Sequence, residues 1–338
     1  MKIKNRHFFA SALTGRGFLS YWNEIFVELK RLYLLNGSTP AGQSLLIRLL
    51  GLEMADRGCQ VHYFHRPEDP LVLEGLTVPS MTFGVLTGDH PYASRKFFPS
   101  HLKVVAVELP NGSEELPTNR MNQSREQAVR LVQSAREIQD EICRGYRARV
   151  QVGEKDVAAK AAGWVQELNE RRSYLRHYFA GSVAVGGAVE FLKHPPGICR
   201  KRYVIKGAPE TGSVVMQEIL VQALSCRFLV EAFHSWINPS DMVLLILPEI
   251  GVYVIDGTCC CDFSPLPGDA VWDLGEDDAA GMFRGEEKKR DEIKSLLAEA
   301  GQALDASREK LETGDLYLTE QEIQQIISRI IKETAEAQ

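Results

Sequence analysis

The chain has 338 residues, of which 44% are apolar and 25% charged, with a formal net charge of −6 and a pI near 5.8. This length exceeds what one hydrophobic core usually serves and predicts two domains. The acidic balance argues against a dedicated nucleic-acid-binding protein, and no apolar run is long enough to span a membrane or to act as a secretion signal. We therefore expect a cytoplasmic protein with neither a membrane nor a nucleic acid as partner.

The first element is a short lead-in that occurs twice. The sequence RHFFA at residues 6–10 recurs as RHYFA at residues 176–180, a displacement of 170 residues (176 − 6 = 170). Apolar residues then follow at helical spacing between residues 18 and 30, which predicts a helix that packs on a sheet. We expect Trp22, on the apolar face of that helix, to belong to the core.

A glycine-bounded turn follows the apolar strand at 32–35 and precedes an apolar helix. Strand, glycine-bounded loop and helix, in this order, are the parts of a phosphate-binding P-loop. The turn consists of Gly37, Ser38, Thr39, Pro40, Ala41, Gly42, Gln43 and Ser44. It recurs, displaced by 170 residues (207 − 37 = 212 − 42 = 170), as Gly207, Ala208, Pro209, Glu210, Thr211, Gly212, Ser213 and Val214. We interpret the chain as a tandem duplication and expect both turns to bind nucleotide phosphates.

The side chains of the two turns depart from P-loop chemistry. After the second glycine, that chemistry uses a lysine that reaches the β- and γ-phosphates and then a hydroxyl that holds magnesium. Gln43 and Ser213 stand at the lysine positions, and Ser44 and Val214 at the hydroxyl positions. Both turns therefore keep the backbone scaffold, whereas neither keeps the lysine and only the first keeps a metal-binding hydroxyl.

Each repeat then has a strand that closes with Phe-His. These strands cover residues 59–65 and 227–234, so that His65 and His234 come at the carboxyl edge of the sheet. Ligands bind at this edge in open α/β folds, which makes the two histidines candidate ligand contacts. The structural alternative is that each histidine forms a hydrogen bond with a neighbouring loop.

A third strand in each repeat brings the candidate metal-binding carboxylate. Residues 82–88 and 250–257 are apolar, and the second of these strands ends at Asp256. A carboxylate in this place resembles the Walker B aspartate that holds magnesium, so Asp256 is the candidate catalytic and metal-binding residue. The first repeat has Thr87 there, and Asp89 is expected to be an exposed turn residue. The metal ligands are thus divided, with Ser44 in one repeat and Asp256 in the other.

Helical extensions follow both repeats. The first is expected to have helices near residues 123–142 and 154–170, and the second near 293–311 and 323–331. Residues 319–322 read TEQE, a capping box that predicts the start of the last helix. The resulting helical hairpins would serve as lids, as dimer contacts or as cover for the core.

The elements together predict an α/β protein with two tandem P-loop NTPase-like lobes. Each lobe would have three layers around a mainly parallel sheet, followed by its helical hairpin. The first lobe is expected at residues 1–172, with its extension from about 115, and the second at residues 173–338, with its extension from about 284.

The seven cysteines are an odd number without the spacing of a disulfide framework, which favours reduced thiols. Cys259 and Cys261 would lie on one side of an extended segment and could form part of a metal site. The alternatives for these two and for Cys260 are small apolar residues at a strand end or a redox sensor.

The repeated order of lead-in, glycine-bounded loop, Phe-His strand and strand ending in DGT at 256–258 resembles an uncharacterised bacterial family of tandem P-loop proteins, usually labelled ATPases or nucleotide kinases. The resemblance covers nearly the whole chain and implies ATP binding with hydrolysis, using Mg²⁺. The family's complete loop, GxPGTGKS, is absent here because Gln43, Ser213 and Val214 replace its lysines and second hydroxyl. The resemblance therefore supports the expected fold more strongly than the expected activity.

Three hypotheses for function remain. In the first, which we favour, the chain is a degenerate, duplicated P-loop protein that binds a nucleotide or other phosphate ligand weakly, with little or no hydrolysis, for sensing or interaction. In the second it is a slow ATPase or nucleotide kinase whose composite site combines Ser44 with Asp256 or with Arg6 or Arg176. In the third it is a structural partner of an intact paralogue, or a homo-oligomer, that uses its helical hairpins as contacts.

Overall fold

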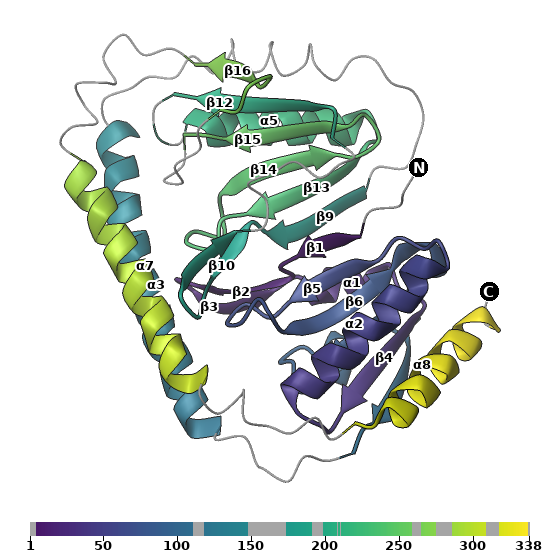
Figure 1. Cartoon of the computed structure of the whole chain (residues 1–338). Coiled ribbons are helices and arrows are strands. Elements are labelled where there is room, and N and C mark those ends of the chain that lie inside the picture. The colour runs from purple at the N-terminus through teal and green to yellow at the C-terminus, as the bar shows by residue number, and fades with distance from the viewer. Residues whose placement is uncertain are drawn as a thin grey trace.

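The computed structural model describes residues 5–110, 118–147, 174–190, 199–207, 209, 211–258, 265–274, 286–308 and 318–336. The protein is an α/β protein with two six-stranded, mainly parallel sheets and helices packed around them (Figure 1). We call the part built on the first sheet the first lobe and the part built on the second sheet the second lobe.

The first sheet has the order β1-β5-β6-β7-β4-β8. Its strands are β1 (Arg6–Phe8), β4 (Arg31–Asn36), β5 (His62–His65), β6 (Leu73–Val78), β7 (Phe83–Thr87) and β8 (Lys103–Glu108). All are parallel except β6, which runs antiparallel to both of its neighbours. Every residue of β5, β6 and β7 is buried, as expected for strands in the middle of a sheet that is covered on both faces.

The second sheet has the order β16-β12-β15-β14-β13-β9, which matches the first sheet strand for strand and direction for direction. Its strands are β9 (Tyr174–Phe179), β12 (Lys201–Lys206), β13 (Leu229–His234), β14 (Met242–Leu247), β15 (Val252–Asp256) and β16 (Ala270–Asp273). The repeat inferred from the sequence is therefore reproduced in the topology. The antiparallel strands β6 and β14 are additions that the sequence pattern did not reveal.

A β-hairpin follows the first strand of each sheet. These hairpins are β2 (Ser11–Thr14) with β3 (Gly17–Ser20), and β10 (Gly181–Ala184) with β11 (Gly187–Glu190). The helix expected from residue 18 is thus partly wrong, because residues 17–20 form β3 and the helix α1 spans only Trp22–Val27. Gly17 has a φ of 98° and turns the chain into β3, which displaces the helix start. Trp22 is fully buried, as expected.

The long helices are α2 (Pro40–Asp56), α3 (Thr118–Arg147), α5 (Thr211–Ser225), α7 (Glu287–Arg308) and α8 (Glu320–Ala335), and two 3₁₀ turns cover Pro79–Met81 and Arg95–Phe97. Both α2 and α5 lead from the repeated glycine turns and pack on their own sheets. The helix expected near residues 154–170 lies outside the described residues, as do Cys259, Cys260 and Cys261.

The helical extensions of the two lobes pair with each other. Lys289 at the start of α7 contacts Glu141 near the end of α3, with Nζ and Oε1 2.9 Å apart, so the helices are antiparallel (Figure 1). Their apolar faces pack on the two β-hairpins in one cluster whose members include Ala128, Val132, Ala135, Ile293, Leu297 and Ala300. The apolar residues of α3 and α7 in this cluster are therefore buried between the two helices and the hairpins.

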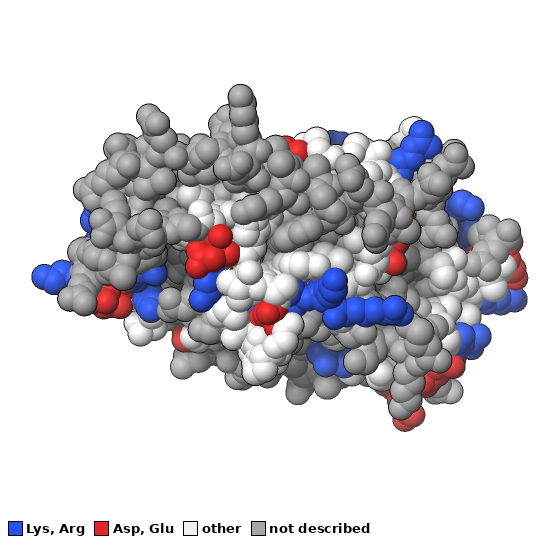
Figure 2. Space-filling model, turned by 90° about the horizontal axis from the view of Figure 1, so that it is seen from above, with Lys and Arg blue, Asp and Glu red and all other residues white. Residues whose placement is uncertain are grey.

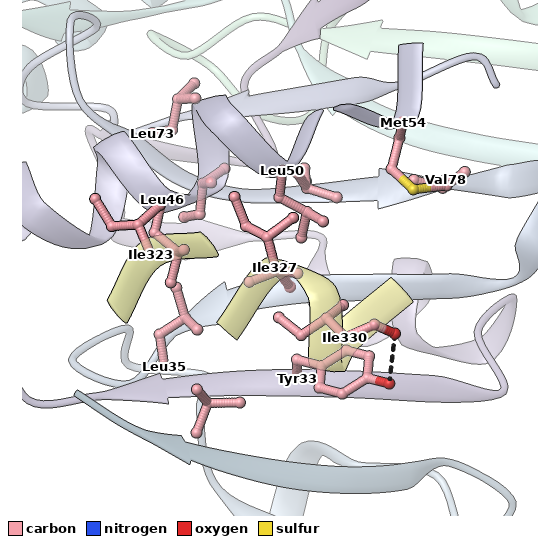
Figure 3. Packing of buried hydrophobic residues seen from close by; sticks show 14 of the residues in the cluster. Tyr33, Leu35, Leu46, Leu50, Met54, Leu73, Val78, Ile323, Ile327 and Ile330 are labelled. Carbon is pink, nitrogen blue, oxygen red and sulfur yellow. Dashed lines mark hydrogen bonds between the residues drawn. The ribbon is translucent and has the colours of Figure 1, made fainter. Parts of the chain in front are cut away.

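The last helix returns to the first lobe. Ile323, Ile327 and Ile330 of α8 pack against α2 and β4, and Tyr33 donates its hydroxyl hydrogen to the carbonyl of Ile330 at 3.3 Å (Figure 3). The expected capping box is present, because Thr319 accepts from the backbone of Glu322 and the Glu322 side chain accepts in return. A helix that follows the second lobe in sequence thus completes the core of the first.

The two lobes meet at the edge strands β1 and β9. Phe179 donates its backbone N–H to the carbonyl of Phe9 at 2.9 Å, and the rings of Phe8 and Tyr178 stack with centroids 4.4 Å apart. One apolar cluster combines Trp22, Phe26, Phe64 and Leu86 of the first lobe with Val204, Phe233, Leu244 and Tyr253 of the second. The lobes therefore share a core.

The surface of the described part carries both charge signs. Viewed from the side of the second lobe, basic side chains lie beside acidic ones (Figure 2). Among the described helices, none combines the length and the apolar character needed to cross a bilayer.

Candidate functional site

The first glycine turn connects β4 to α2 through two residues in the left-handed region. Gly37 has a φ of 78° and Ser38 a φ of 60°. Thr39 caps α2, and its hydroxyl accepts the N–H of Gly42 at 3.1 Å. A Cβ at Gly42 would lie 2.5 Å from Ser38 Oγ, so the helix can approach the turn this closely only because glycine stands there. The local sequence thus builds a tight turn against a helix N-terminus.

Gln43, at the position of the P-loop lysine, folds back over this turn. Its Nε2 donates to the carbonyl of Gly37 at 2.7 Å and to that of Leu35 at 3.4 Å, and the side chain is only 5% exposed. Its Oε1 is buried without a hydrogen-bond partner among the described residues. The amide therefore closes the turn from inside, and no positive charge extends from this position toward a ligand.

Ser44, the candidate metal ligand of the first repeat, is engaged in the fold. Its hydroxyl accepts the backbone N–H of Leu73, the first residue of β6, at 2.9 Å. The residue is 5% exposed, and Thr87 at the end of β7 is fully buried. The hydroxyl thus ties α2 to the antiparallel strand.

The second glycine turn connects β12 to α5. Gly207 has a φ of 156°, and Pro209 is buried. Ala208 and Glu210 lie outside the described residues. Thr211 is the first residue of α5, and Val214, at the metal-binding hydroxyl position, is 40% exposed. This turn has no hydroxyl where the metal ligand of a P-loop would stand.

Asp256 lies directly against the first turn of α5. Its Oδ1 accepts the backbone N–H of Thr258 at 2.8 Å and the hydroxyl of Thr258 at 2.6 Å. The same hydroxyl accepts the N–H of Gly212 at 3.1 Å. A Cβ at Gly212 would lie 2.0 Å from Asp256 Oδ1, so the carboxylate is in contact with the helix backbone. A negative charge is stabilised at a helix N-terminus, which gives Asp256 a structural role here.

The residues present do not fit a complete Mg²⁺–nucleotide site. Ser44 and Asp256 belong to different lobes, and each is hydrogen-bonded within its own lobe. The arginines considered for a composite site are also engaged, because Arg6 pairs with Glu231 and Arg176 with Glu28. No group of three His, Cys, Asp or Glu side chains that could hold a metal ion occurs in the part of the chain that the structure describes.

His65 and His234 both form the hydrogen bond to a neighbouring loop that the structural alternative predicts, and in the same way. His65 Nδ1 lies 2.5 Å from the carbonyl of Pro70, and His234 Nδ1 lies 3.0 Å from that of Pro239. A carbonyl only accepts, so Nδ1 carries the hydrogen and Nε2 is the acceptor in the neutral ring. Burial lowers the pKa of both rings to about 4, so they are neutral at pH 7. Each histidine therefore fixes the turn that follows its strand.

A second histidine completes each pair. His7 Nδ1 lies 2.8 Å from His65 Nε2, and His177 Nδ1 lies 2.8 Å from His234 Nε2. Because Nε2 of His65 or His234 accepts, Nδ1 of His7 or His177 donates the hydrogen. The Nε2 of His7 and of His177 is then left as an acceptor. Both lobes thus contain a relay from a carbonyl through His65 or His234 to His7 or His177, and only the last histidine of each relay belongs to the repeated sequence RHxF.

The first lobe has a buried ionic group at its carboxyl edge that sequence reasoning missed. Arg66, directly after β5, pairs with Asp89 at 2.5 Å and is 7% exposed. Burial would raise the pKa of Asp89, but the charge and hydrogen bond of Arg66 outweigh it and lower that pKa. Asp89 lies in the turn after β7 with its side chain 36% exposed, as expected, while its carboxyl is the counter-ion of a buried arginine.

Glu74 and His90 lie beside this ion pair. Glu74 Oε1 accepts from Ser11 Oγ and from Trp22 Nε1, both at 2.8 Å. His90 Nδ1 accepts the N–H of Tyr92 at 3.1 Å, so its Nε2 carries the hydrogen and donates to Ser11 Oγ, also at 3.1 Å.

The proton direction in this group runs from histidine to serine to carboxylate. A serine nucleophile needs the reverse, with histidine accepting the serine proton. Ser11 is also fully buried. The arrangement is therefore a buried polar network and not a catalytic triad. The signal that could have located it is Glu74 itself, a carboxylate inside an apolar strand.

No protein-family model, no curated protein and no solved structure matches the chain in the comparisons with known proteins.

Proposed function

We propose that this protein is a duplicated, degenerate P-loop NTPase-like protein that binds a nucleotide or another phosphate ligand weakly and hydrolyses it little or not at all, in a sensing or interaction role. The strand, glycine turn and helix order in both lobes supports this assignment. Analogy at the level of the fold supports a common ancestry with P-loop proteins. The geometry of the first glycine turn supports the loss of turnover.

The observation that carries the proposal is the position of Gln43. Phosphoryl transfer depends on positive charge that neutralises the developing charge on the transferred group, supplied by lysine and magnesium together. Here a neutral amide occupies the lysine position and bonds to the carbonyls of Gly37 and Leu35. A ligand at this turn would meet backbone N–H groups and the helix dipole but no cation from position 43, which favours weak anion binding without chemistry.

The test is a calorimetric titration with ATP, ADP and GTP, with and without Mg²⁺, alongside a phosphate-release assay on the same sample. We expect binding in the high micromolar to millimolar range, little dependence on Mg²⁺, and no release above background. Turnover that is abolished by both Ser44→Ala and Asp256→Asn would instead establish the composite enzyme and overturn the proposal. No binding at millimolar nucleotide or inorganic phosphate would also overturn it.

A variant that restores the lysine tests whether the turn keeps a phosphate-binding geometry and lacks only the side chain. Gln43→Lys should strengthen ATP binding about tenfold or more, because it adds a cation at the turn. Gln133→Lys is the matched control, since it makes the same charge change on the exposed surface of α3. Equal binding by both variants would show that the turn no longer has phosphate-binding geometry.

A further inference from the structure

A cleft of about 600 Å³ lies between the lobes, away from both glycine turns. It opens where α1 and the first sheet meet β9, and none of its lining residues belongs to the turns at 37–44 or 207–214. Its acidic, basic and imidazole lining side chains are Glu24, Glu28, His62, Arg176 and His177, and its apolar lining includes Leu29, Phe64 and Leu175. A cleft of this volume accommodates a small organic molecule.

His177 presents a hydrogen-bond acceptor to this cleft. Its Nδ1 donates to His234 Nε2, and His234 Nδ1 in turn donates to the carbonyl of Pro239. The carbonyl therefore determines the tautomer of both rings and leaves the Nε2 of His177 without a hydrogen in the neutral ring. Burial lowers the pKa of His177, which favours this neutral form.

Glu24 of α1 faces the same nitrogen. Its Oε2 lies 3.9 Å from His177 Nε2, too far for a direct hydrogen bond, and its side chain is 44% exposed. Two acceptors therefore point at one another across a gap that only a donor can bridge. Partial burial raises the pKa of Glu24, so its carboxylate gains from a positive charge placed in the gap.

The rest of the cleft selects for a cation as well. Arg176 Nε lies 2.7 Å from Glu28 Oε1, so this pair is neutral as a unit. His62 is buried, and burial followed by the charges of Arg6 and Arg176 keeps its pKa well below the ordinary value. With both histidines neutral, Glu24 is left as the net charge of the lining, and it disfavours anions.

We infer that this cleft binds an organic amine, whose ammonium group donates to both His177 Nε2 and Glu24 while its apolar body lies along Leu29, Phe64 and Leu175. An ammonium has three donors and can satisfy both acceptors at once. A metal ion would find only these two ligands in the gap, and in the described residues no third His, Cys, Asp or Glu completes a set.

The first lobe supplies a natural comparison. His7 has the same relay through His65 and likewise ends in an acceptor nitrogen. No carboxylate is paired with His7 in the described part of the chain, and the pKa of His7 is lowered by burial and by the positive charge of Arg48. The amine site is therefore expected in the second relay only.

The test uses three probes of one shape: 2-phenylethylamine, 2-phenylethanol and 3-phenylpropionate, titrated calorimetrically into the full chain at pH 7.5. We expect the amine to bind at least about tenfold more tightly than the alcohol, and the carboxylate to show no binding, because a charged hydrogen bond in a partly buried site is worth about one order of magnitude or more. Glu24→Gln should weaken amine binding about tenfold or more.

His177→Phe should weaken amine binding to a similar extent. His7→Phe, the matched change in the other relay, should leave the affinity for the amine within about twofold of the parent. Circular dichroism and a thermal melt verify that the variants fold, and Glu24→Gln, on a partly exposed side chain, keeps the test informative if His177→Phe does not. Equal affinity for amine and alcohol, an unaffected Glu24→Gln variant, or no amine binding at 10 mM would each overturn the inference. Because the site shares no residue with the glycine turns, these results are independent of nucleotide binding.

Discussion

Arg6 of the first lobe donates from both terminal nitrogens to the two carboxylate oxygens of Glu231 in the second lobe, each at 2.6 Å. The two side chains are 8% and 1% exposed. The position that corresponds to Glu231 in the first repeat holds His62 (231 − 62 = 233 − 64 = 169), so the pair forms only once. Arg176, the repeat counterpart of Arg6, instead binds Glu28 at the rim of the interlobe cleft. A symmetric sequence repeat has thus become an asymmetric interface.

We predict that Glu231→Gln lowers the free energy of unfolding by about 3–5 kcal/mol, because it leaves the buried guanidinium of Arg6 without a counter-charge. Chemical denaturation followed by tryptophan fluorescence measures the effect. Glu53→Gln is the control, since it breaks the exposed pair with Arg57 and should cost less than about 0.5 kcal/mol.

A second variant separates the ion pair from its packing. Replacing both partners, as Arg6→Met with Glu231→Leu, removes the unpaired charge and should recover most of the loss. A single variant as stable as the parent would show that Arg6 is solvated in solution and that the lobes are not joined there.

The strand pattern was predictable for the strands that the sequence repeats, because their apolar runs and flanking turns are local signals. Both β7 and β15 were located to within one or two residues of their ends. The antiparallel strand β6 was not, since it is buried on both faces and contains Glu74 and Gly75, which break any alternation. Its place between β5 and β7 is decided by pairing with distant strands, which local sequence does not encode.

The candidate site was predictable as a scaffold and not as a set of contacts. The glycine turns, their positive φ values and the helices after them follow from the residue types. The hydrogen-bond partners of the side chains do not follow from the residue types, because Ser44 binds the backbone of β6 and Asp256 binds Thr258. The partner of Ser44 lies 29 residues away, outside the glycine turn, and the DGT motif at 256–258 contains Thr258 without showing that its hydroxyl binds Asp256. The interlobe cleft was equally hidden, because Glu24 and His177 meet only through tertiary packing.

Glu74 should make the stability depend on pH. Burial raises its pKa from 4.5 to about 8 in the folded protein, despite the hydrogen bonds from Trp22 and Ser11 and the charge of Arg66. The folded state therefore holds a proton that the unfolded state has lost, and stability falls as the pH rises through this range, by up to about 1.4 kcal/mol per pH unit.

The neighbouring His90 narrows the pH range in which the effect of Glu74 on stability can be measured. Burial lowers its pKa from 6.5 to about 3, so below pH 6.5 the unfolded state takes up a proton that the folded state does not. The two contributions cancel between about pH 4.5 and 6.5, and only the Glu74 contribution remains between pH 6.5 and 8. Urea denaturation at pH 6.5, 7.25 and 8 should show the decline, and Glu74→Gln should abolish it. A decline of the same slope in that variant would assign it to another group.

The return of α8 to the first lobe leads to the last prediction. Ile327 is 4% exposed and packs among side chains of α2 and β4, so Ile327→Ala should destabilise the protein by about 2–5 kcal/mol (Figure 3). Gln324→Ala, on the exposed face of the same helix, should change the stability by less than about 0.5 kcal/mol. Hydrogen exchange locates the effect, because the amides of β4 should lose protection in Ile327→Ala while those of β12 in the second lobe keep theirs. Equal loss in both strands would mean that the two lobes unfold as one cooperative unit through their shared core, and no loss in β4 would mean that α8 does not pack there in solution.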